Sequence, residues 1–182
     1  MRYHIEKKSR SDVMNPTLQY EKGLYFRDRK EYLVSLMTHE DNYLIWKYLT
    51  FLRREEAAGN KLTQLYWRRR KNDLGAKLGI TAYAGCCGKG LHIWHWGSII
   101  ISGEAKIGEN CTFHGQACIG NDGKSSKAPV IGNNVDIGVG ARILGDIVIA
   151  DDVKIGANAV VTKSCLEKGA TLVGIPARVL KK

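Results

Sequence analysis

The stretch "VIGNNVDIGVGARILGDIVIADDVKIGANAVV", Val130 to Val161, repeats itself every six residues. An aliphatic residue occupies every sixth position, and from Ile137 onward a small or aliphatic residue stands two positions before each of them. The sixth-position residues are Ile131, Ile137, Ile143, Ile149, Ile155 and Val161. This period is neither that of an amphipathic helix nor the strict alternation of a long strand. It predicts short strands joined by tight turns, in which three hexapeptides complete one triangular coil.

The same period continues upstream, with its aliphatic or aromatic positions at Ile101, Ile107, Phe113 and Ile119. It is interrupted at position 125, because "NDGKSSKAP", 121–129, replaces one repeat unit before Ile131 returns in phase. We therefore predict a mainly β chain with a parallel β-helix over residues 80–182. Residues eighteen apart, such as Ile119, Ile137 and Ile155, should stack in ladders. A solenoid is rigid and leaves flat faces and open ends, so we expect its active sites to use loops and neighbouring subunits.

The chain before residue 80 has a helical pattern instead. Apolar residues recur at helical spacing on segments with charged backs, at Leu33, Leu36, Met37, Leu44, Ile45, Tyr48, Leu49 and Leu52. We predict an N-terminal segment and α-helical cap over residues 1–79. A further helix over 61–77 carries "RRRK", Arg68 to Lys71. We interpret this run as a solvated helix face rather than a phosphate-binding patch, because basic runs on helices usually are only that.

The composition limits the partners without choosing one. The chain has 182 residues and a formal net charge of +10; residues 1–80 hold 17 Lys and Arg against 10 Asp and Glu. Such an excess suits an anionic partner, whether a phosphorylated cofactor, nucleic acid or an acidic membrane surface. The first thirty residues are charged where a signal peptide needs an apolar run, and no window approaches the roughly 18 apolar residues of a membrane span. We expect a cytoplasmic protein.

The five cysteines are odd in number and form no CxxC pair, so neither a disulfide framework nor a zinc knuckle is indicated. The stretch "GLHIWHWGS", 90–98, is the chemically richest segment. His92 is interpreted as an outward-facing strand residue. Trp94 and Trp96 either stack on the apolar faces of a sugar acceptor or pack against the cap or a neighbouring subunit. His114 lies nineteen residues after His95, about one coil further, and either lines an acceptor pocket or serves as a hydrogen-bonded corner residue.

The ten repeat positions, with "GARILGDIVI", "VKIGANAVV" and the terminal "GIPARV", resemble the hexapeptide-repeat acyltransferases with a left-handed parallel β-helix. Within them the chain is most similar to the serine acetyltransferases and their relatives in surface-polysaccharide gene clusters. The resemblance implies an acetyl-CoA-dependent O-acetyltransferase that acts as a homotrimer with active sites at the subunit interfaces. It implies that His95 is the general base. A neutral imidazole suits this task, since an alcohol does not ionise at neutral pH.

Several positions depart from the serine acetyltransferase pattern. Trp94 and Ile80 stand where that family has acidic residues, and Lys127, Ala128 and Pro129 correspond to an Arg-His-Pro segment that helps to hold the carboxylate of serine. We therefore expect the acceptor to be a sugar of a surface polysaccharide or its precursor, with serine as the alternative. The residues expected to contact the acceptor are Trp94, His92, His114 and Lys127.

The resemblance also implies where coenzyme A lies. Its pantetheine arm should meet the backbone around Gly120, Asn121, Val139 and Ala157, with Lys154 near the phosphorylated end. Small residues there would keep a groove open, although the tight turns of the repeat need small residues as well.

Two other classes of function compete with acetyl transfer. Three histidines on neighbouring coils suggest a zinc site like that of hexapeptide-repeat carbonic anhydrases. His92 and His95 have opposite parity on an extended strand and so point to opposite sides, and we therefore expect no metal. A non-catalytic scaffold that binds an anionic partner gains from the "RRRK" run. It loses because the chain carries no nucleic-acid-binding motif, and we expect no nucleic-acid partner.

Overall fold

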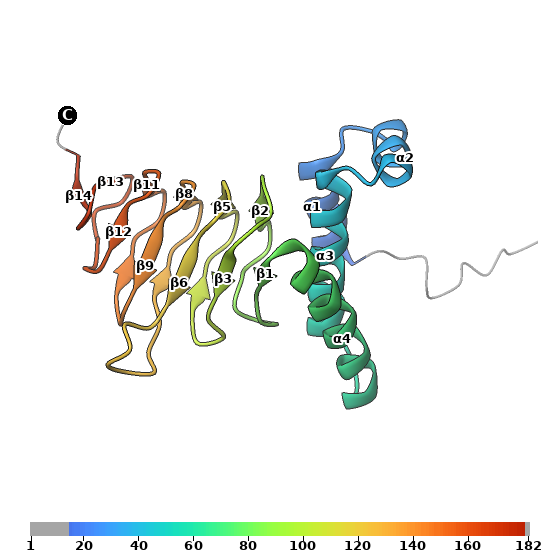
Figure 1. Ribbon diagram of the computed structural model, residues 1–182, viewed down its shortest axis with the longest axis horizontal. Helices are drawn as coiled ribbons and strands as arrows, with labels where there is room; N and C mark the ends of the chain where they lie inside the picture. The colour runs from blue at the N-terminus through green and yellow to red at the C-terminus, as the bar shows by residue number, and fades with distance from the viewer. Residues whose placement is uncertain (1–14, 181–182) are drawn as a thin grey trace, which may run out of the picture.

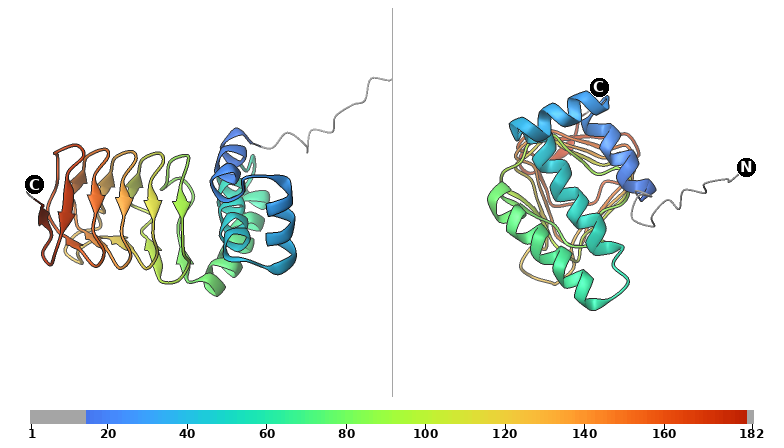
Figure 2. Two further views of the ribbon diagram at one scale, coloured as in Figure 1. Left: turned by 90° about the horizontal axis from the view of Figure 1, so that it is seen from above. Right: turned by 90° about the vertical axis from the view of Figure 1, so that its right-hand side faces the viewer.

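The computed structural model describes residues 15–180, which form a helical cap at one end of a β-solenoid (Figure 1). The cap consists of α1 (Pro16–Tyr25), α2 (Arg29–Thr38), α3 (Asp41–Glu56) and α4 (Lys61–Leu78). The side chains of Asn15, Asp28 and Asn60 cap the N-termini of α1, α2 and α4, each by accepting a backbone N–H. Helix α4 ends at Gly79, whose φ of 64° suits glycine. No periodic pattern predicted α1. Figure 2 shows the four helices covering the end of the solenoid.

The solenoid is built from strands of two or three residues. They are β1 (Ile80–Thr81), β2 (His92–Ile93), β3 (Ile99–Ile101), β4 (Lys106–Ile107), β5 (Thr112–Phe113), β6 (Cys118–Gly120), β7 (Val130–Ile131), β8 (Asp136–Ile137), β9 (Arg142–Leu144), β10 (Val148–Ile149), β11 (Lys154–Ile155), β12 (Val160–Val161), β13 (Thr171–Val173) and β14 (Arg178–Val179). They form three sheets in the orders β1-β3-β6-β9-β12, β10-β7-β4 and β14-β13-β11-β8-β5-β2. All the pairings are parallel except that of β13 with β14. The predicted parallel β-helix is confirmed.

The ladder register corrects one detail of the prediction. Ile137 pairs with Ile155, eighteen residues later, as expected, but Ile119 pairs with Ile143 rather than with Ile137. The reason is the loop at 121–129, which projects from one edge of the solenoid (Figure 1). The loop adds one hexapeptide to its coil, so residues on either side of it stack at a separation of twenty-four.

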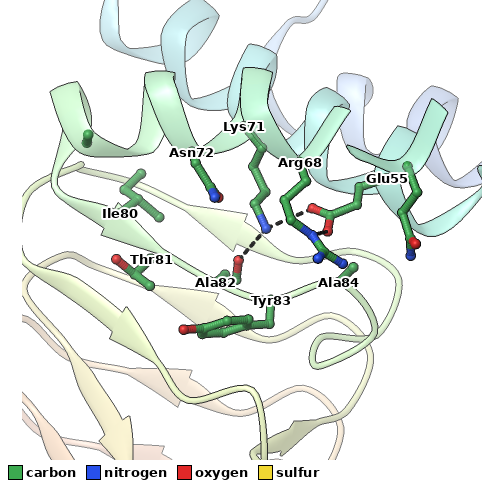
Figure 3. Close-up of a pocket in the computed structure, with 11 residues that line it drawn as sticks. Glu55, Arg68, Lys71, Asn72, Ile80, Thr81, Ala82, Tyr83 and Ala84 are labelled. Atoms are coloured by element: carbon green, nitrogen blue, oxygen red, sulfur yellow. Dashed lines mark hydrogen bonds and ion pairs between the residues drawn. The ribbon is translucent and has the colours of Figure 1, made fainter. Parts of the chain in front are cut away.

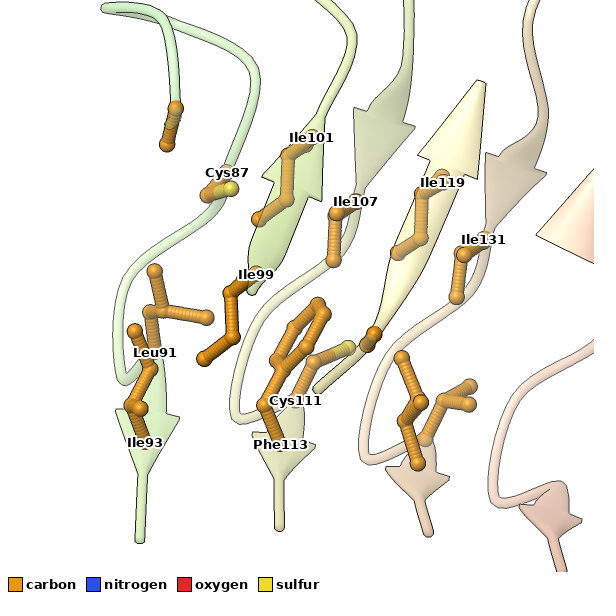
Figure 4. Close-up of a cluster of buried hydrophobic side chains, with 14 of the residues drawn as sticks. Cys87, Leu91, Ile93, Ile99, Ile101, Ile107, Cys111, Phe113, Ile119 and Ile131 are labelled. Carbon is orange, nitrogen blue, oxygen red and sulfur yellow. The ribbon is translucent and has the colours of Figure 1, made fainter. Parts of the chain in front are cut away.

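The interior of the solenoid is filled by the sixth-position residues, whose side chains point inward (Figure 4). Phe113, Ile119 and Ile143 have no exposed surface. The apolar core continues from these coils into the cap, where Tyr48, Leu49 and Leu52 are also buried. The predicted division into residues 1–79 and 80–182 stays a prediction, since one core spans both parts.

The cap is held to the first coil by hydrogen bonds as well as by apolar packing. The Tyr25 hydroxyl accepts from the Ile93 backbone N–H at 2.8 Å and donates to the Ile93 carbonyl at 3.2 Å. The Tyr48 hydroxyl accepts from the Ala82 N–H at 3.1 Å. Burial raises the pKa of both tyrosines, so both hydroxyls stay protonated and can serve as donors.

The "RRRK" run on α4 is only partly the solvated face that we expected. Lys71 is buried; its ammonium lies 2.8 Å from both the Glu55 carboxylate and the Ala82 carbonyl (Figure 3). Half-exposed Arg68 contacts the other oxygen of Glu55 at 2.7 Å. These groups line a cavity of about 500 Å³ between α4 and β1. The run therefore neutralises an internal carboxylate. Within residues 15–180 no helix is long and apolar enough to cross a membrane.

Candidate active site

A cleft that contains two histidines, an aspartate and a lysine lies on the outer face of the six-stranded sheet. Register places His92, Thr112, Asp136, Lys154 and Thr171 at successive rungs of one outward row. Side chains of neighbouring parallel strands on one face lie side by side. Asp136, Lys154 and Thr171 of this row, together with the turns that follow the strands, form a cleft of about 500 Å³. It is lined by His95, His114, Asp136, Gly138, Val139, Lys154, Ile155, Gly156, Ala157 and Thr171.

His95 is exposed and lies on the turn that follows β2. The turn rests against the next coil at Gly115, whose φ is 127°. A Cβ atom on Gly115 would lie 3.3 Å from the His95 carbonyl oxygen and 3.4 Å from the His95 Cβ. Glycine at this position therefore lets the turn that carries His95 approach the turn that follows β5. Within residues 15–180 the structure gives the His95 ring no hydrogen-bond partner, so both ring nitrogens are available to a ligand.

His114 is brought to the same cleft from β5 and is paired with Asp136 on β8. The distance from His114 Nε2 to Asp136 Oδ1 is 2.7 Å, and the two side chains are 43% and 45% exposed. His114 thus lines the cleft and is also hydrogen-bonded, and its role toward an acceptor stays a prediction. Asp136 was not predicted as a site residue from the sequence. An eighteen-residue spacing puts His114 opposite residue 132, whereas the real coil with its added hexapeptide puts His114 beside Asp136 and Gly138.

An aromatic row supports one side of His114. Tyr25 of the cap packs edge-on against His92 at a centroid distance of 5.0 Å, and His92 packs against Trp94 at 4.8 Å. Trp94 in turn stacks on His114, with centroids 6.3 Å apart and an interplanar angle of 15°. Burial, and secondly the nearby charge of His114, lower the pKa of His92. His92 and Trp94 therefore stand behind His114, and neither is among the residues that line the cleft.

The other predicted site residues divide into two groups. Val139, Ala157 and Lys154, predicted to contact coenzyme A, line the cleft. Gly120 and Asn121 lie at the end of β6, in a different sheet, and are not among the lining residues. Lys127 lies in the projecting loop, where its ammonium is 2.7 Å from the Asp146 carboxylate. The structure thus gathers three of the five predicted coenzyme A residues, and it places Lys127 apart from the cleft.

Metal ligation was the competing use of the histidines. In the described part of the chain no group of three or more His, Cys, Asp or Glu side chains could hold a metal ion. His92 packs against the cap and His114 is bound to Asp136, so these two rings already have partners. All five cysteines are free, and four of them are buried.

Comparison with known proteins agrees with this geometry. Residues 128–163 match the family described as bacterial transferase hexapeptide (six repeats). Over 107 residues the chain is 41% identical to a serine acetyltransferase of Helicobacter pylori (strain ATCC 700392 / 26695), a match that covers 57% of this chain and 62% of that protein. Over 95 residues it is 38% identical to a serine acetyltransferase of Synechococcus elongatus, which covers 51% of this chain and 38% of the relative.

Solved structures give the same result for the fold. Soybean serine acetyltransferase, as apoenzyme, superposes with a TM-score of 0.71 at 24% identity, over 91% of this chain and 70% of that one. Serine acetyltransferase (CysE) of Neisseria gonorrhoeae gives a TM-score of 0.68 at 25% identity, over 91% and 66%. The predicted left-handed parallel β-helix with an N-terminal helical cap is confirmed.

The class that the fold and the repeat define is therefore a hexapeptide-repeat protein with a left-handed β-helix. Within it the chain is similar to serine acetyltransferases, as the sequence predicted. The chain spans about three fifths of the length of its Helicobacter pylori relative and less of the Synechococcus one. Both relatives are named serine acetyltransferases, which corresponds to the acceptor that we gave as the alternative, and neither is named for a surface-polysaccharide sugar.

Proposed function

We propose that the chain transfers an acetyl group from acetyl-CoA to a hydroxyl group of a small acceptor, with His95 as general base. The observation that carries this proposal is the position of His95. His95 has no hydrogen-bond partner for its ring among residues 15–180, and it lines a cleft that Gly138, Gly156 and Ala157 also line. A fold shared with serine acetyltransferases supports the same reaction.

The reaction requires one group that acts first as a base and then as an acid. The neutral imidazole of His95 takes the proton of the acceptor hydroxyl as the oxygen attacks the thioester carbonyl, and a new C–O bond forms. The C–S bond then breaks, and the imidazolium returns its proton to the departing thiolate. Atoms balance without a covalent acetyl-enzyme, so both substrates are bound together. Because His95 is exposed to the cleft and unpaired within residues 15–180, its ring can turn between the two partners.

The rest of the cleft fits a narrow ligand with a charged end. The small residues Gly138, Gly156 and Ala157 leave room for a pantetheine arm, and the Lys154 ammonium can interact with the phosphates of coenzyme A. Gly120 and Asn121 remain proposed contacts further along the arm. A homotrimer would bring a second chain against the open side of the cleft, and we propose that arrangement on the basis of the resemblance.

Serine is the acceptor to test first, because the relatives carry that name. A carbohydrate is the second candidate, on a separate observation: Trp94 is 48% exposed and Trp96 is 41% exposed on the segment that carries His95, and exposed indole faces suit the apolar faces of sugars.

The test is release of free coenzyme A thiol from acetyl-CoA with serine, simple sugars and nucleotide sugars as acceptors. We expect His95→Ala to abolish turnover and to leave coenzyme A binding intact. His39→Asn is the matched control, because His39 is an exposed histidine of the cap with a φ of 54°, a conformation that asparagine also adopts. Turnover by His95→Ala at the rate of the parent protein would overturn the proposal.

A further inference from the structure

The His114–Asp136 pair lies in the cleft but has no part in the proton transfer assigned to His95. It is formed by two side chains twenty-two residues apart, which meet because β5 and β8 are neighbours in register, Phe113 opposite Ile137. Both side chains are a little under half exposed. The pair thus keeps polar surface open to a ligand while its internal hydrogen bond fixes the ring.

The hydrogen bond determines what His114 offers to a ligand. A carboxylate only accepts hydrogen bonds, so the Nε2 atom that faces Asp136 must carry the proton. In the neutral ring Nδ1 is then left with a lone pair and becomes an acceptor. Stacking on Trp94 restricts rotation of the imidazole plane, so this lone pair keeps a fixed direction.

The charge of the pair also favours a hydrogen-bond donor as its ligand. When the imidazole is neutral, the form in which Nδ1 is an acceptor, the pair with an ionised carboxylate carries a net charge of −1. The second oxygen of Asp136 has no hydrogen-bond partner among residues 15–180. Two residues that line the cleft therefore each have an acceptor atom without a partner in residues 15–180. Among the described residues that line the cleft, Lys154 is the only lysine or arginine, and it lies at the next rung beyond Asp136.

We propose that the His114–Asp136 pair recognises a hydrogen-bond donor on the acceptor, next to the hydroxyl that is acetylated. The inference rests on the proposed function and deepens it, since it names the acceptor class: a compound with a vicinal N–H or O–H donor. In serine this donor is the ammonium group, and in a sugar it is a neighbouring hydroxyl. The negative charge of the pair favours the ammonium.

The size of the effect follows from the exposure of the pair. A hydrogen bond to a charged group contributes about 1.5 to 3 kcal/mol, which corresponds to roughly a 10- to 100-fold change in kcat/KM. We expect the lower part of this range, because water competes for both side chains.

The experiment compares acceptors that differ only in the donor. L-serine is paired with 3-hydroxypropionate, which lacks the ammonium, and a methyl glycoside is paired with its monodeoxy analogues. The parent protein, Asp136→Asn and His114→Gln are assayed by thiol release. Asp152→Asn is the control, because Asp152 is a carboxylate outside the cleft that pairs with Lys168 at 3.1 Å. Thermal melting verifies that each variant is folded. If Asp136→Asn does not fold, His114→Gln alone provides the test.

We expect the parent protein and Asp152→Asn to prefer the acceptor with the donor by about tenfold or more. Either substitution in the pair should reduce this preference to within about threefold, through KM of the acceptor and not through KM of acetyl-CoA. A preference that survives both substitutions, or an equal loss for both members of an acceptor pair, overturns the inference and leaves the proposed function standing. A parent protein that releases no thiol with any acceptor overturns the proposed function, and this inference with it.

Discussion

Arg53 on α3 and Glu21 on α1 form a buried ion pair in which Nη2 lies 2.7 Å from Oε1. The pair does more than join two helices. Arg53 also donates to the carbonyls of Cys87 at 2.8 Å and Gly88 at 2.6 Å, and Glu21 accepts from the Gly90 N–H at 3.0 Å. Burial opposes the charge on Arg53, but the hydrogen bonds and charges of Glu21 and Glu56 outweigh it and raise its pKa. The pair therefore connects the cap to the coil that precedes His95.

Replacement of Glu21 by Gln should be strongly destabilising. Glu21 has no exposed surface, so the variant leaves the Arg53 guanidinium inside the protein with less compensating charge. Removal of one partner of a buried pair costs about 3 to 5 kcal/mol in free energy of unfolding. Urea denaturation measures this loss. Glu31→Gln, which breaks the exposed pair of Arg27 with Glu31, should cost less than about 1 kcal/mol. Equal effects for the two variants would contradict the structural role of Arg53.

The interior of the solenoid offers a second test of stability. Phe113 has no exposed surface, and its ring lies among the isoleucines of the neighbouring coils (Figure 4). We expect Phe113→Ala to lower the free energy of unfolding by about 3 to 5 kcal/mol, because the variant loses apolar burial and leaves a cavity. Ile100→Ala is the control, since Ile100 is on a strand of the same solenoid but is 52% exposed. The same denaturation curves should show a much smaller loss for it.

These two sites also show how much of the structure could be predicted from the sequence. Phe113 falls on the six-residue period, so its burial could be predicted from spacing alone. The Glu21–Arg53 pair could not be predicted. No apolar pattern predicted the helix that contains Glu21, and its partner is thirty-two residues away. The period likewise predicted the solenoid but not the pairing of His114 with Asp136. That pairing depends on how many residues the 121–129 loop adds to its coil, and a loop length does not determine whether the loop stays inside the coil or projects from it.

The glycine and alanine wall of the cleft yields a prediction about the acetyl donor. Ala157 is exposed and lines the cleft, so Ala157→Trp should fill the groove without disturbing the core. We expect the dissociation constant for coenzyme A, measured by calorimetry, to rise about tenfold or more, while the melting temperature stays within a few degrees. Ser125→Trp, in the projecting loop, should leave coenzyme A binding unchanged. Undiminished binding by Ala157→Trp would place the donor elsewhere on the solenoid.

His92 provides a prediction about pH. Burial against Tyr25, and secondly the charge of His114, lower the pKa of His92, so we expect its imidazole to titrate below the ordinary value of about 6.5. The folded state binds this proton less readily than the unfolded state. The contribution to stability is therefore present above about pH 6.5 and is lost as the pH falls toward the folded pKa. Titration of the histidine ring signals by NMR measures the midpoint, and His114→Ala should raise it only in part, because burial is the larger cause. A midpoint at or above 6.5 in the parent protein would contradict the packing of His92 between Tyr25 and Trp94.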